Sequence, residues 1–217
     1  MHRVLDDGTL LIAVADGAGS ASRSKEGAEC AALAAVEFLA ERLPATDQME
    51  PLLTETLSAA RAAVESLAAD GSGASDFATT LLLAVITASQ VSTIQVGDGA
   101  IVVQLSDGNS LEVMTAKGDS EYINQTTFIT SSNYLEAACF ASRPSGNVHA
   151  VAVMTDGMQL LAVHHSTNTA FGAFFAPMFR FASDPTSTDE ALADFLMSEA
   201  VCRRTDDDKT LVLTVRR

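Results

Sequence analysis

The chain has 217 residues, 47% of them hydrophobic and 19% charged, which is the composition of a folded globular protein and excludes a disordered one. Its 13 Lys and Arg residues stand against 28 Asp and Glu residues, so the formal net charge is −15 at pH 7. Because so acidic a chain repels phosphate backbones and anionic lipid headgroups, we expect neither nucleic acid nor a membrane as its partner.

The N-terminal third predicts one strand and two helices. The apolar run over residues 9–15 is typical of a buried strand, and it ends in the turn-rich loop 16–20. Apolar residues then recur with helical spacing over about 22–42 and again over about 47–69. The Gly-Ser-Gly sequence at 71–73 breaks the second helix.

The middle of the chain predicts consecutive strands, at residues 79–87, 91–96, 100–105 and 111–115. The turns between them contain Gly97-Asp98-Gly99 and Asp107-Gly108-Asn109, which together predict an antiparallel meander. Residues 117–147 are polar and weakly periodic, so they are predicted to form a long surface segment.

The C-terminal part predicts a strand over 149–154, helices over 171–181 and 188–198, and a last strand over 210–215. No Pro- or Ser-rich linker and no repeat interrupts the chain, so residues 1–217 are interpreted as a single domain. Because strands and helices occur in blocks rather than alternating, the order favours a layered α+β fold over a doubly wound parallel sheet.

Aspartates follow three of the predicted strands, each as part of an Asp-Gly pair: Asp16, Asp98 and Asp156. Near the C-terminus the order is inverted, and Asp206-Asp207-Asp208 precede an apolar run. If these strand ends meet on one side, the carboxylates converge and need a cation to offset their repulsion. Oxygen ligands alone favour Mg²⁺ or Mn²⁺ over zinc. A lone Asp-Gly is typical of an ordinary turn, so spacing leaves both interpretations open.

The same segments resemble the motifs of type 2C metal-dependent protein serine/threonine phosphatases. Residues 15–21, Ala-Asp-Gly-Ala-Gly-Ser-Ala, are similar to the Asp-Gly-x-Gly-Gly segment of that family. Thr79-Thr80 followed by residues 95–100 is similar to its threonine-rich strand and Gly-Asp-Ser-Arg turn. Residues 154–157 are similar to its Ser/Thr-Asp-Gly motif, and residues 207–210 to its Asp-Asn/Asp-x-Thr motif.

These motifs keep the family's order over residues 9–215, and segments 121–126 and 204–210 look like those of a compact bacterial subgroup. The resemblance implies a four-layer αββα sandwich, in which two antiparallel sheets are flanked by helices. It also implies a flap beside the site, formed by the segment 117–147.

The resemblance implies a metal centre of two Mn²⁺ or Mg²⁺ ions. Asp16 would bridge the two ions and Gly17 would offer its backbone carbonyl. Asp156 and Asp207 would complete one metal shell, so that Asp16, Asp156 and Asp207 act in catalysis through the ions and water. Asp98 together with Asp156 would hold a third, weaker ion.

The implied activity is hydrolysis of phosphoserine and phosphothreonine in proteins by a metal-activated water. The expected partner is a phosphorylated protein substrate, and we expect the phosphatase to work opposite a Ser/Thr kinase and to be a monomer. The alternative is a related module with a weakened metal centre that acts as a regulatory binding partner. A calcium-stabilised structural domain is a third interpretation of the same aspartates.

The sequence departs from the family pattern in three places. Ala18 stands where eukaryotic members carry a histidine, and Ala100 follows Gly99 where the Gly-Asp-Ser-Arg arginine is expected. The family also has one more strand before Thr9, which carries an acidic ligand, and in the subgroup a Cys-Gln-Asp-like motif would fall just before His2. We therefore expect a chain that lacks this strand, by truncation or as a natural variant. Asp7-Gly8 is predicted to be a hairpin turn.

The cysteines indicate the compartment and exclude one other phosphatase chemistry. Cys30, Cys139 and Cys202 are too far apart for a disulfide framework or a zinc site, which favours a reducing cytoplasm. None is followed six residues later by arginine, as cysteine-dependent phosphatases require. We find neither a signal peptide nor an apolar run of about 18 residues.

Other motifs admit simpler interpretations. Residues 206–210 match the Asp-x-Asp-x-Thr motif of haloacid-dehalogenase-like phosphatases, but here the strand follows the motif and the chain then ends. The pair His164-His165 is interpreted as solvated, and Arg23 and Lys25 as exposed residues at a helix start. The phenylalanines between residues 171 and 181 are interpreted as core, with a partner-docking patch as the alternative.

Overall fold

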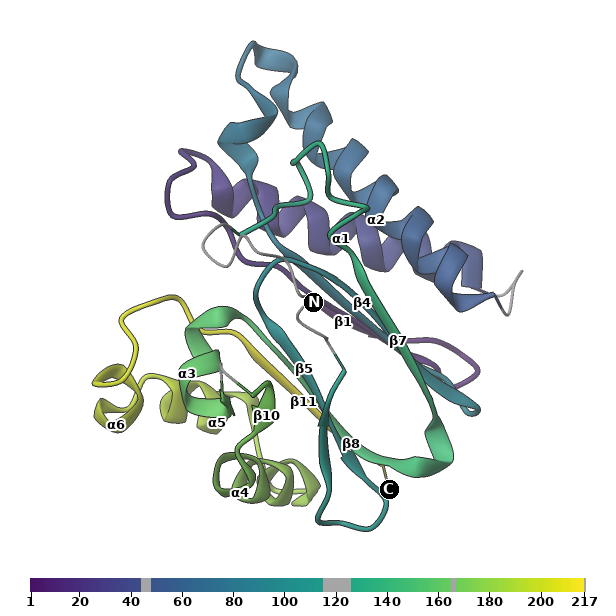
Figure 1. Ribbon diagram of the computed structural model, residues 1–217, viewed down its shortest axis with the longest axis vertical. Helices are drawn as coiled ribbons and strands as arrows, with labels where there is room; N and C mark the ends of the chain where they lie inside the picture. The colour runs from purple at the N-terminus through teal and green to yellow at the C-terminus, as the bar shows by residue number, and fades with distance from the viewer. Residues whose placement is uncertain (44–47, 115–125, 165–166, 217) are drawn as a thin grey trace.

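Two antiparallel sheets face each other across an apolar core, and helices cover the outer side of each (Figure 1). The computed structural model describes residues 1–43, 48–114, 126–164 and 167–216. These four layers, helix–sheet–sheet–helix, are the αββα sandwich that the resemblance implied, so the fold prediction is confirmed.

The first sheet has five strands in the order β1-β2-β3-β4-β7. They are β1 (His2–Val4), β2 (Leu10–Val14), β3 (Leu81–Ile86), β4 (Gln90–Val96) and β7 (Cys139–Pro144). The second sheet has four strands in the order β11-β8-β5-β6. They are β5 (Ala100–Leu105), β6 (Leu111–Val113), β8 (Val148–Met154) and β11 (Leu211–Val215). A separate ribbon pairs β9 (Val163–His164) with β10 (Thr169–Ala170).

Helices α1 (Ser24–Arg42) and α2 (Met49–Ser66) lie side by side over the first sheet, as Figure 1 shows. The second sheet is covered by shorter helices: α3 (Gln159–Ala162), α4 (Gly172–Ser183), α5 (Asp189–Leu196) and α6 (Glu199–Cys202). Short 3-10 turns occupy Leu67–Asp70, Ala74–Phe77, Ser145–Asn147 and Asp156–Met158. No helix in the described part of the chain is long and apolar enough to cross a membrane.

Strands β2 and β3 are apolar throughout because both of their faces are buried. In β2, Leu11 and Ala13 pack toward the helices while Ile12 and Val14 pack between the sheets. Alternate side chains of a strand point to opposite faces, so a strand covered on both sides favours apolar residues at every position. Strand β4 is an exception, since it buries Ser92, Thr93 and Gln95. The prediction of a buried strand over residues 9–15 is confirmed.

The predicted meander is wrong at the turn Gly97-Asp98-Gly99. β3 pairs with β4 and β5 pairs with β6, but β4 and β5 belong to different sheets. The turn therefore carries the chain from the first sheet across to the second. Glycine-rich turn chemistry is the same for a hairpin and for such a crossing, so local sequence did not distinguish them.

The segment 117–147, predicted as a surface loop, contains a strand in its last part. β7 pairs with β4 at the open edge of the first sheet, and its side chains are partly or fully exposed. Such an edge strand has no apolar run to mark it. Residues 117–125 lie outside the described residues.

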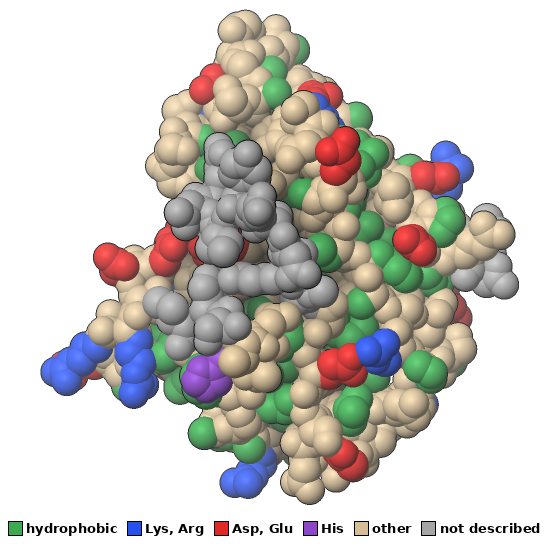
Figure 2. Space-filling model, in the orientation of Figure 1, with side chains coloured by type: hydrophobic (Ala, Val, Ile, Leu, Met, Phe, Trp, Pro, Cys, Tyr) green, Lys and Arg blue, Asp and Glu red, His purple; other side chains and the backbone are tan. Residues whose placement is uncertain are grey.

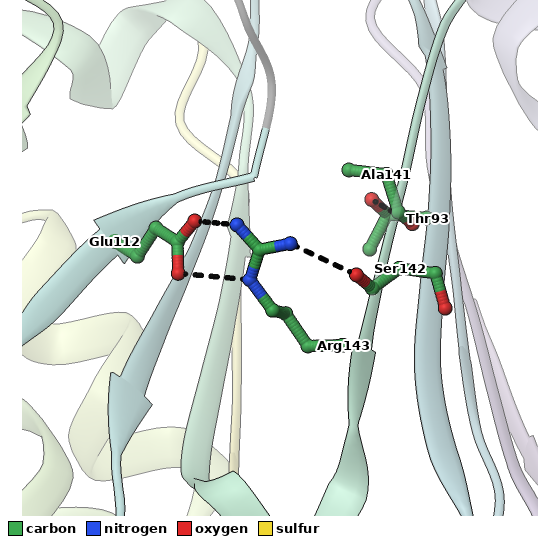
Figure 3. A network of polar contacts seen from close by, with 5 residues as sticks. All are labelled: Thr93, Glu112, Ala141, Ser142 and Arg143. Carbon is green, nitrogen blue, oxygen red and sulfur yellow. Dashed lines mark hydrogen bonds and ion pairs between the residues drawn. The ribbon is translucent and has the colours of Figure 1, made fainter.

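An ion pair joins the two sheets at this edge. Arg143 of β7 makes two side-chain hydrogen bonds to the carboxylate of Glu112 on β6, and its Nη1 donates to the carbonyl of Ser142 at 3.1 Å (Figure 3). The ion pair thus links the edge strand β7 of the first sheet to the edge strand β6 of the second.

The hairpin turn predicted at Asp7-Gly8 is present, and a short strand, β1, precedes Thr9, where we expected the strand to be missing. β1 pairs with β2, with His2 opposite Ile12, and the backbone N–H of Gly8 donates to the carbonyl of Leu5 at 2.9 Å. The Asp7 carboxylate accepts from the backbone N–H of Thr9 at 2.8 Å. Asp7 thus serves the turn itself, as its position in an Asp-Gly pair predicts.

Candidate metal centre

The strand ends that carry the aspartates meet at one end of the sandwich. Asp16 follows β2, Asp98 lies in the crossing from β4 to β5, and Asp156 directly follows β8. In the second sheet Met154 is opposite Leu211 and Ala100. This register brings the turn with Asp156 beside the turn with Asp98 and beside residues 206–208, which precede β11.

Two carboxylates at this end, those of Asp16 and Asp156, are half-buried and have raised pKa values. The pKa of Asp16 is raised to about 7, first by burial and then by the hydrogen-bonded side chain of Asp156 and the charges of Asp156, Asp207 and Asp208. Burial likewise raises the pKa of Asp156, and the charges of Asp98 and Asp207 act in the same direction. Asp16 and Asp156 therefore interact with each other and with Asp207, while Asp208 acts on Asp16 and Asp98 acts on Asp156.

Two features test whether these residues suit a divalent ion. Oδ1 of Asp156 is buried and has no hydrogen-bond partner among the described residues, and such an oxygen is costly unless a cation or water meets it. Its neighbours are carboxylates, the donors that Mg²⁺ and Mn²⁺ prefer.

The carboxylates do not form a closed cage. Within the described ranges, no group of three or more His, Cys, Asp or Glu side chains is drawn together as it would be around a chelated ion. Ions such as Mg²⁺ keep several water ligands and need only one or two carboxylates each. The residues therefore fit hydrated hard ions better than a structural zinc.

Two threonines directly before β3 hold the backbone of Asp16. The N–H of Thr80 and the hydroxyl of Thr79 each donate to the Asp16 carbonyl at 2.8 Å, and the N–H of Asp16 donates to Oγ1 of Thr80 at 3.0 Å. Gly17 pairs with Thr79 as an isolated bridge. Both threonines are buried, so the loop after β2 is fixed from beneath.

Two glutamines hold the turn that carries Asp98. Gln95 Nε2 donates to the carbonyls of Gly97 at 2.8 Å and Gly99 at 2.9 Å. Gln159, at the start of α3, donates to the carbonyls of Asp98 and Gly99. Gly97 has a φ of +111°, a conformation that side chains other than glycine rarely adopt. Neither glutamine was identified from the sequence.

Contacts of Thr155 join the turn after β8 to the loop before β11. The N–H of Thr210 donates to Oγ1 of Thr155 at 3.1 Å, and the N–H of Thr155 donates to the Thr210 carbonyl at 3.2 Å. The loop is closed locally, because the Asp207 carboxylate accepts from the N–H of Asp208 at 2.9 Å. Asp207 and Asp208 are both exposed.

The segment before β7 also contacts the site. Thr126 Oγ1 donates to Oδ2 of Asp98 at 2.5 Å. Residues 121–125 of the subgroup-like motif, which ends at Thr126, lie outside the described residues. No pattern in the sequence singled out this hydroxyl as a partner of Asp98.

The remaining predicted residues lie in simpler surroundings. Ala18 is buried, and its N–H donates to the carbonyl of Ala78 at 2.9 Å. Arg23 pairs with Glu26 and lies 4.4 Å from the centre of the Phe77 ring.

The histidine pair and the phenylalanines lie on the second sheet's side. The His164 ring packs on Phe171, with 3.7 Å between ring centres, while His165 lies outside the described residues. Phe175 and Phe179 are buried in the core of that layer, so at these positions the core interpretation is confirmed.

The surface around the site carries both signs of charge. Figure 2 shows acidic side chains over the loop before β11 and a group of Lys and Arg side chains beside it, over the end of α6. The sequence there contains Arg203, Arg204 and Lys209, and Lys209 Nζ donates to the Asp207 carbonyl at 3.0 Å. The residues of the Asp-x-Asp-x-Thr match, 206–210, precede β11, so in the structure too the strand follows this motif.

Comparison with known proteins gives a consistent result. The model of the family described as protein phosphatase 2C matches residues 1–197. Serine/threonine-protein phosphatase 3 of Escherichia coli K12 is 35% identical over 220 residues, which cover 95% of this chain and 83% of that protein.

Two solved structures have the same fold. The serine/threonine phosphatase Stp1 from Staphylococcus aureus superposes with a TM-score of 0.66 at 16% identity, over 100% of this chain and 87% of that one. A Stage II sporulation E family protein from Thermanaerovibrio acidaminovorans gives a TM-score of 0.61 at 19% identity, over 100% and 99% of the two chains.

Proposed function

Since this chain belongs to the protein phosphatase 2C family, we propose that it hydrolyses phosphoserine and phosphothreonine in proteins with the help of divalent ions at the strand-end aspartates. The convergence of Asp16, Asp98, Asp156, Asp207 and Asp208 carries the proposal. The raised pKa values of Asp16 and Asp156 support it, because a carboxylate cluster of this kind binds either protons or cations.

We assign the ligands as follows. Asp16 would hold both of two Mn²⁺ or Mg²⁺ ions and Gly17 would contribute its carbonyl, while Asp156 and Asp207 would complete one shell. The interactions of Asp16 with Asp156 and Asp207 support this set. Asp98 and Asp156 would hold a third, weaker ion, and the effect of Asp98 on the pKa of Asp156 supports that pair.

When bound, such ions supply a water that loses its proton near neutral pH and offset the charge of the phosphoryl oxygens. The protein's own part is placement. Thr79 and Thr80 hold the Asp16 backbone, and Gln95 and Gln159 hold the turn with Asp98. Because an ion-activated water would itself be the nucleophile, no phospho-enzyme is needed.

The substrate class follows from this chemistry. A phosphate ester of a Ser or Thr hydroxyl is made by phosphoryl transfer, so a Ser/Thr kinase must act before this protein. We propose a monomer, since the described strand-end aspartates all come from one chain. The cytoplasmic location stays a prediction from the cysteine pattern.

The test is hydrolysis of p-nitrophenyl phosphate and of phosphoserine, phosphothreonine and phosphotyrosine peptides, with Mn²⁺ and with EDTA. We expect Mn²⁺-dependent release of phosphate from the first two peptides, and its loss in Asp16→Asn and Asp156→Asn. Asp189→Asn, on the exposed first turn of α5, is the matched control. A chain that binds phosphopeptides without Mn²⁺-dependent turnover would instead be the regulatory binding module.

A further inference from the structure

Residues 126–138 extend from the aspartates to the outer face of α2. Midway along them Ile129 is fully buried in the core beneath the helices. Its N–H donates to the carbonyl of Thr79 at 3.0 Å. Because the Thr79 hydroxyl donates to the Asp16 carbonyl, the same residue holds both this segment and the loop with Asp16.

Three contacts fasten the far end of the segment to α2. The hydroxyls of Ser58 and Tyr134 are 3.0 Å apart, and Arg61 Nη1 donates to the Ser131 carbonyl at 2.5 Å. The Arg61 guanidinium also lies 4.6 Å from the centre of the Tyr134 ring, and its Nε donates to Glu65. A segment with a buried middle and a bonded end has a defined position relative to the site.

The near end of the segment bears Thr126, whose hydroxyl donates to Oδ2 of Asp98. The backbone of Asp98 is already held by Gln159, which reaches it from α3. The backbone contacts do not set the rotation of the carboxylate about its Cβ–Cγ bond, whereas a hydrogen bond to one of its two oxygens does. The other carboxylate oxygen then remains available as a ligand for a cation.

We propose that Thr126 is a positioning residue for Asp98, and that the attachment of residues 126–138 to α2 through Arg61 determines where Thr126 stands. The inference rests on the proposed function, since it concerns how one of the assigned ligands is oriented. It gives the described part of the flap-like segment a role in ion binding, in addition to any effect on which phosphoprotein docks.

Two alternative roles of Thr126 predict different effects on ion binding. If the Thr126 hydroxyl competed with the ion for Oδ2, its removal would strengthen ion binding. If the segment only filled space, a threonine-to-valine change of nearly the same shape would leave ion binding unchanged. Positioning alone predicts a loss that serine repairs, because serine restores the hydroxyl without the methyl group.

The experiment is calorimetric titration of the full chain with Mn²⁺, together with Mn²⁺-dependent hydrolysis of p-nitrophenyl phosphate. We expect Thr126→Val to lower the affinity for the most weakly bound Mn²⁺ by about tenfold, because it removes a hydrogen bond to a residue that would hold that ion. The tighter ions and the melting temperature of the metal-free chain should not change. Thr126→Ser should restore the affinity, and Thr54→Val, which removes a hydroxyl that donates to the Glu50 carbonyl within α2, should match the wild type.

A second variant tests the remote attachment. Arg61→Gln should weaken the same Mn²⁺ by a smaller factor, whereas Arg42→Gln, on the surface of α1 beside Phe38, should not. Unchanged or tighter Mn²⁺ binding in Thr126→Val, or failure of serine to restore it, overturns the inference while the wild type stays active. A wild-type chain that binds Mn²⁺ but hydrolyses neither phosphoserine nor phosphothreonine peptides overturns only the proposed function. A wild-type chain that binds no Mn²⁺ overturns both the proposed function and the inference.

Discussion

The backbone carbonyl of Asp208 lies so close to the Cα of Gly157 that a Cβ at position 157 would collide with it. Gly157 follows Asp156 in the turn after β8, and Asp208 follows Asp207 in the loop before β11. The absence of a side chain at Gly157 thus lets the two loops that carry Asp156 and Asp207 touch. This contact explains why the second residue of this Asp-Gly pair is glycine.

Gly157→Ala should separate these two loops. Because the obstructing atom is backbone and cannot rotate away, we expect a loss of about 1–3 kcal/mol in the free energy of unfolding. Mn²⁺-dependent hydrolysis should fall with it, since Asp156 and Asp207 move apart. Denaturant unfolding and phosphate release measure the two effects.

Gly172→Ala is the control for this change. Gly172 begins α4 and has no atom near its virtual Cβ, so alanine there should be neutral or slightly stabilising. If Gly157→Ala matched Gly172→Ala in both measurements, the contact with Asp208 would have no energetic importance.

Thr80→Val should disturb Asp16 without altering the shape of the core. The buried Thr80 hydroxyl accepts from the N–H of Asp16 at 3.0 Å, and valine leaves that N–H without this acceptor, at a cost of about 1–3 kcal/mol. We expect the affinity for Mn²⁺ to fall by about 10-fold or more, as measured by titration calorimetry.

Thr56→Val separates this effect from the general loss of a buried hydroxyl. Thr56 is fully buried in α2, and its hydroxyl donates to the carbonyl of Leu52 at 2.7 Å, far along the chain from the aspartates. Its replacement should change stability alone. Equal Mn²⁺ affinity in Thr80→Val and Thr56→Val would contradict a role for Thr80 at the site.

The strands and the aspartates that follow them were predictable because both leave a local pattern. The apolar strand Leu10–Val14 is followed closely in sequence by the Asp-Gly pair at Asp16, and the strand Val148–Met154 by the pair at Asp156. The partner of a strand is not local, so the crossing at Asp98 was predicted as a hairpin. The edge strand β7 has few buried residues and gave no signal.

The residues that support the aspartates were missed for a related reason. Gln159 donates to the backbone of a residue 61 positions earlier, and Thr126 donates to Asp98 from 28 positions later. An amide or hydroxyl that binds a distant chain segment has no required spacing and no required neighbour. Only the folded chain identifies such contacts.

Gln159→Leu should loosen the turn that carries Asp98. The change removes the donor to the carbonyls of Asp98 and Gly99 while it keeps much of the side-chain volume. We expect about 1 kcal/mol less stability and roughly 10-fold weaker binding of the third ion, measured by denaturant unfolding and Mn²⁺ titration.

Gln104→Leu offers a closely matched control. Gln104 Nε2 donates to the carbonyl of Gly108 at 2.9 Å, so it too fastens a turn, but in an exposed hairpin of the second sheet. Its loss should cost no more than about 0.5 kcal/mol and leave Mn²⁺ binding intact. A third-ion affinity that is equal in the two variants would sink the prediction for Gln159.

Stability of the metal-free chain should depend on pH through Asp16. Burial and neighbouring carboxylates raise the pKa of Asp16 to about 7 in the folded chain, whereas an unfolded Asp titrates near 3.9. The folded state therefore binds this proton more tightly, and the stabilisation is present in full below the unfolded pKa. It is lost as pH rises through the folded pKa, so in EDTA the melting temperature should fall between pH 5 and pH 8.

Two comparisons identify Asp16 as the source of that slope. Asp16→Asn removes the titrating group, so the melting temperature in EDTA should vary less with pH than in the wild type. Saturating Mn²⁺ should raise the melting temperature most at pH 8, because the ion replaces the proton at the same carboxylates. A melting temperature in EDTA that rises from pH 5 to pH 8 would contradict this prediction. It would show that the carboxylates of the metal-free chain repel one another too weakly to affect stability, and it would weaken the case for a cation between them.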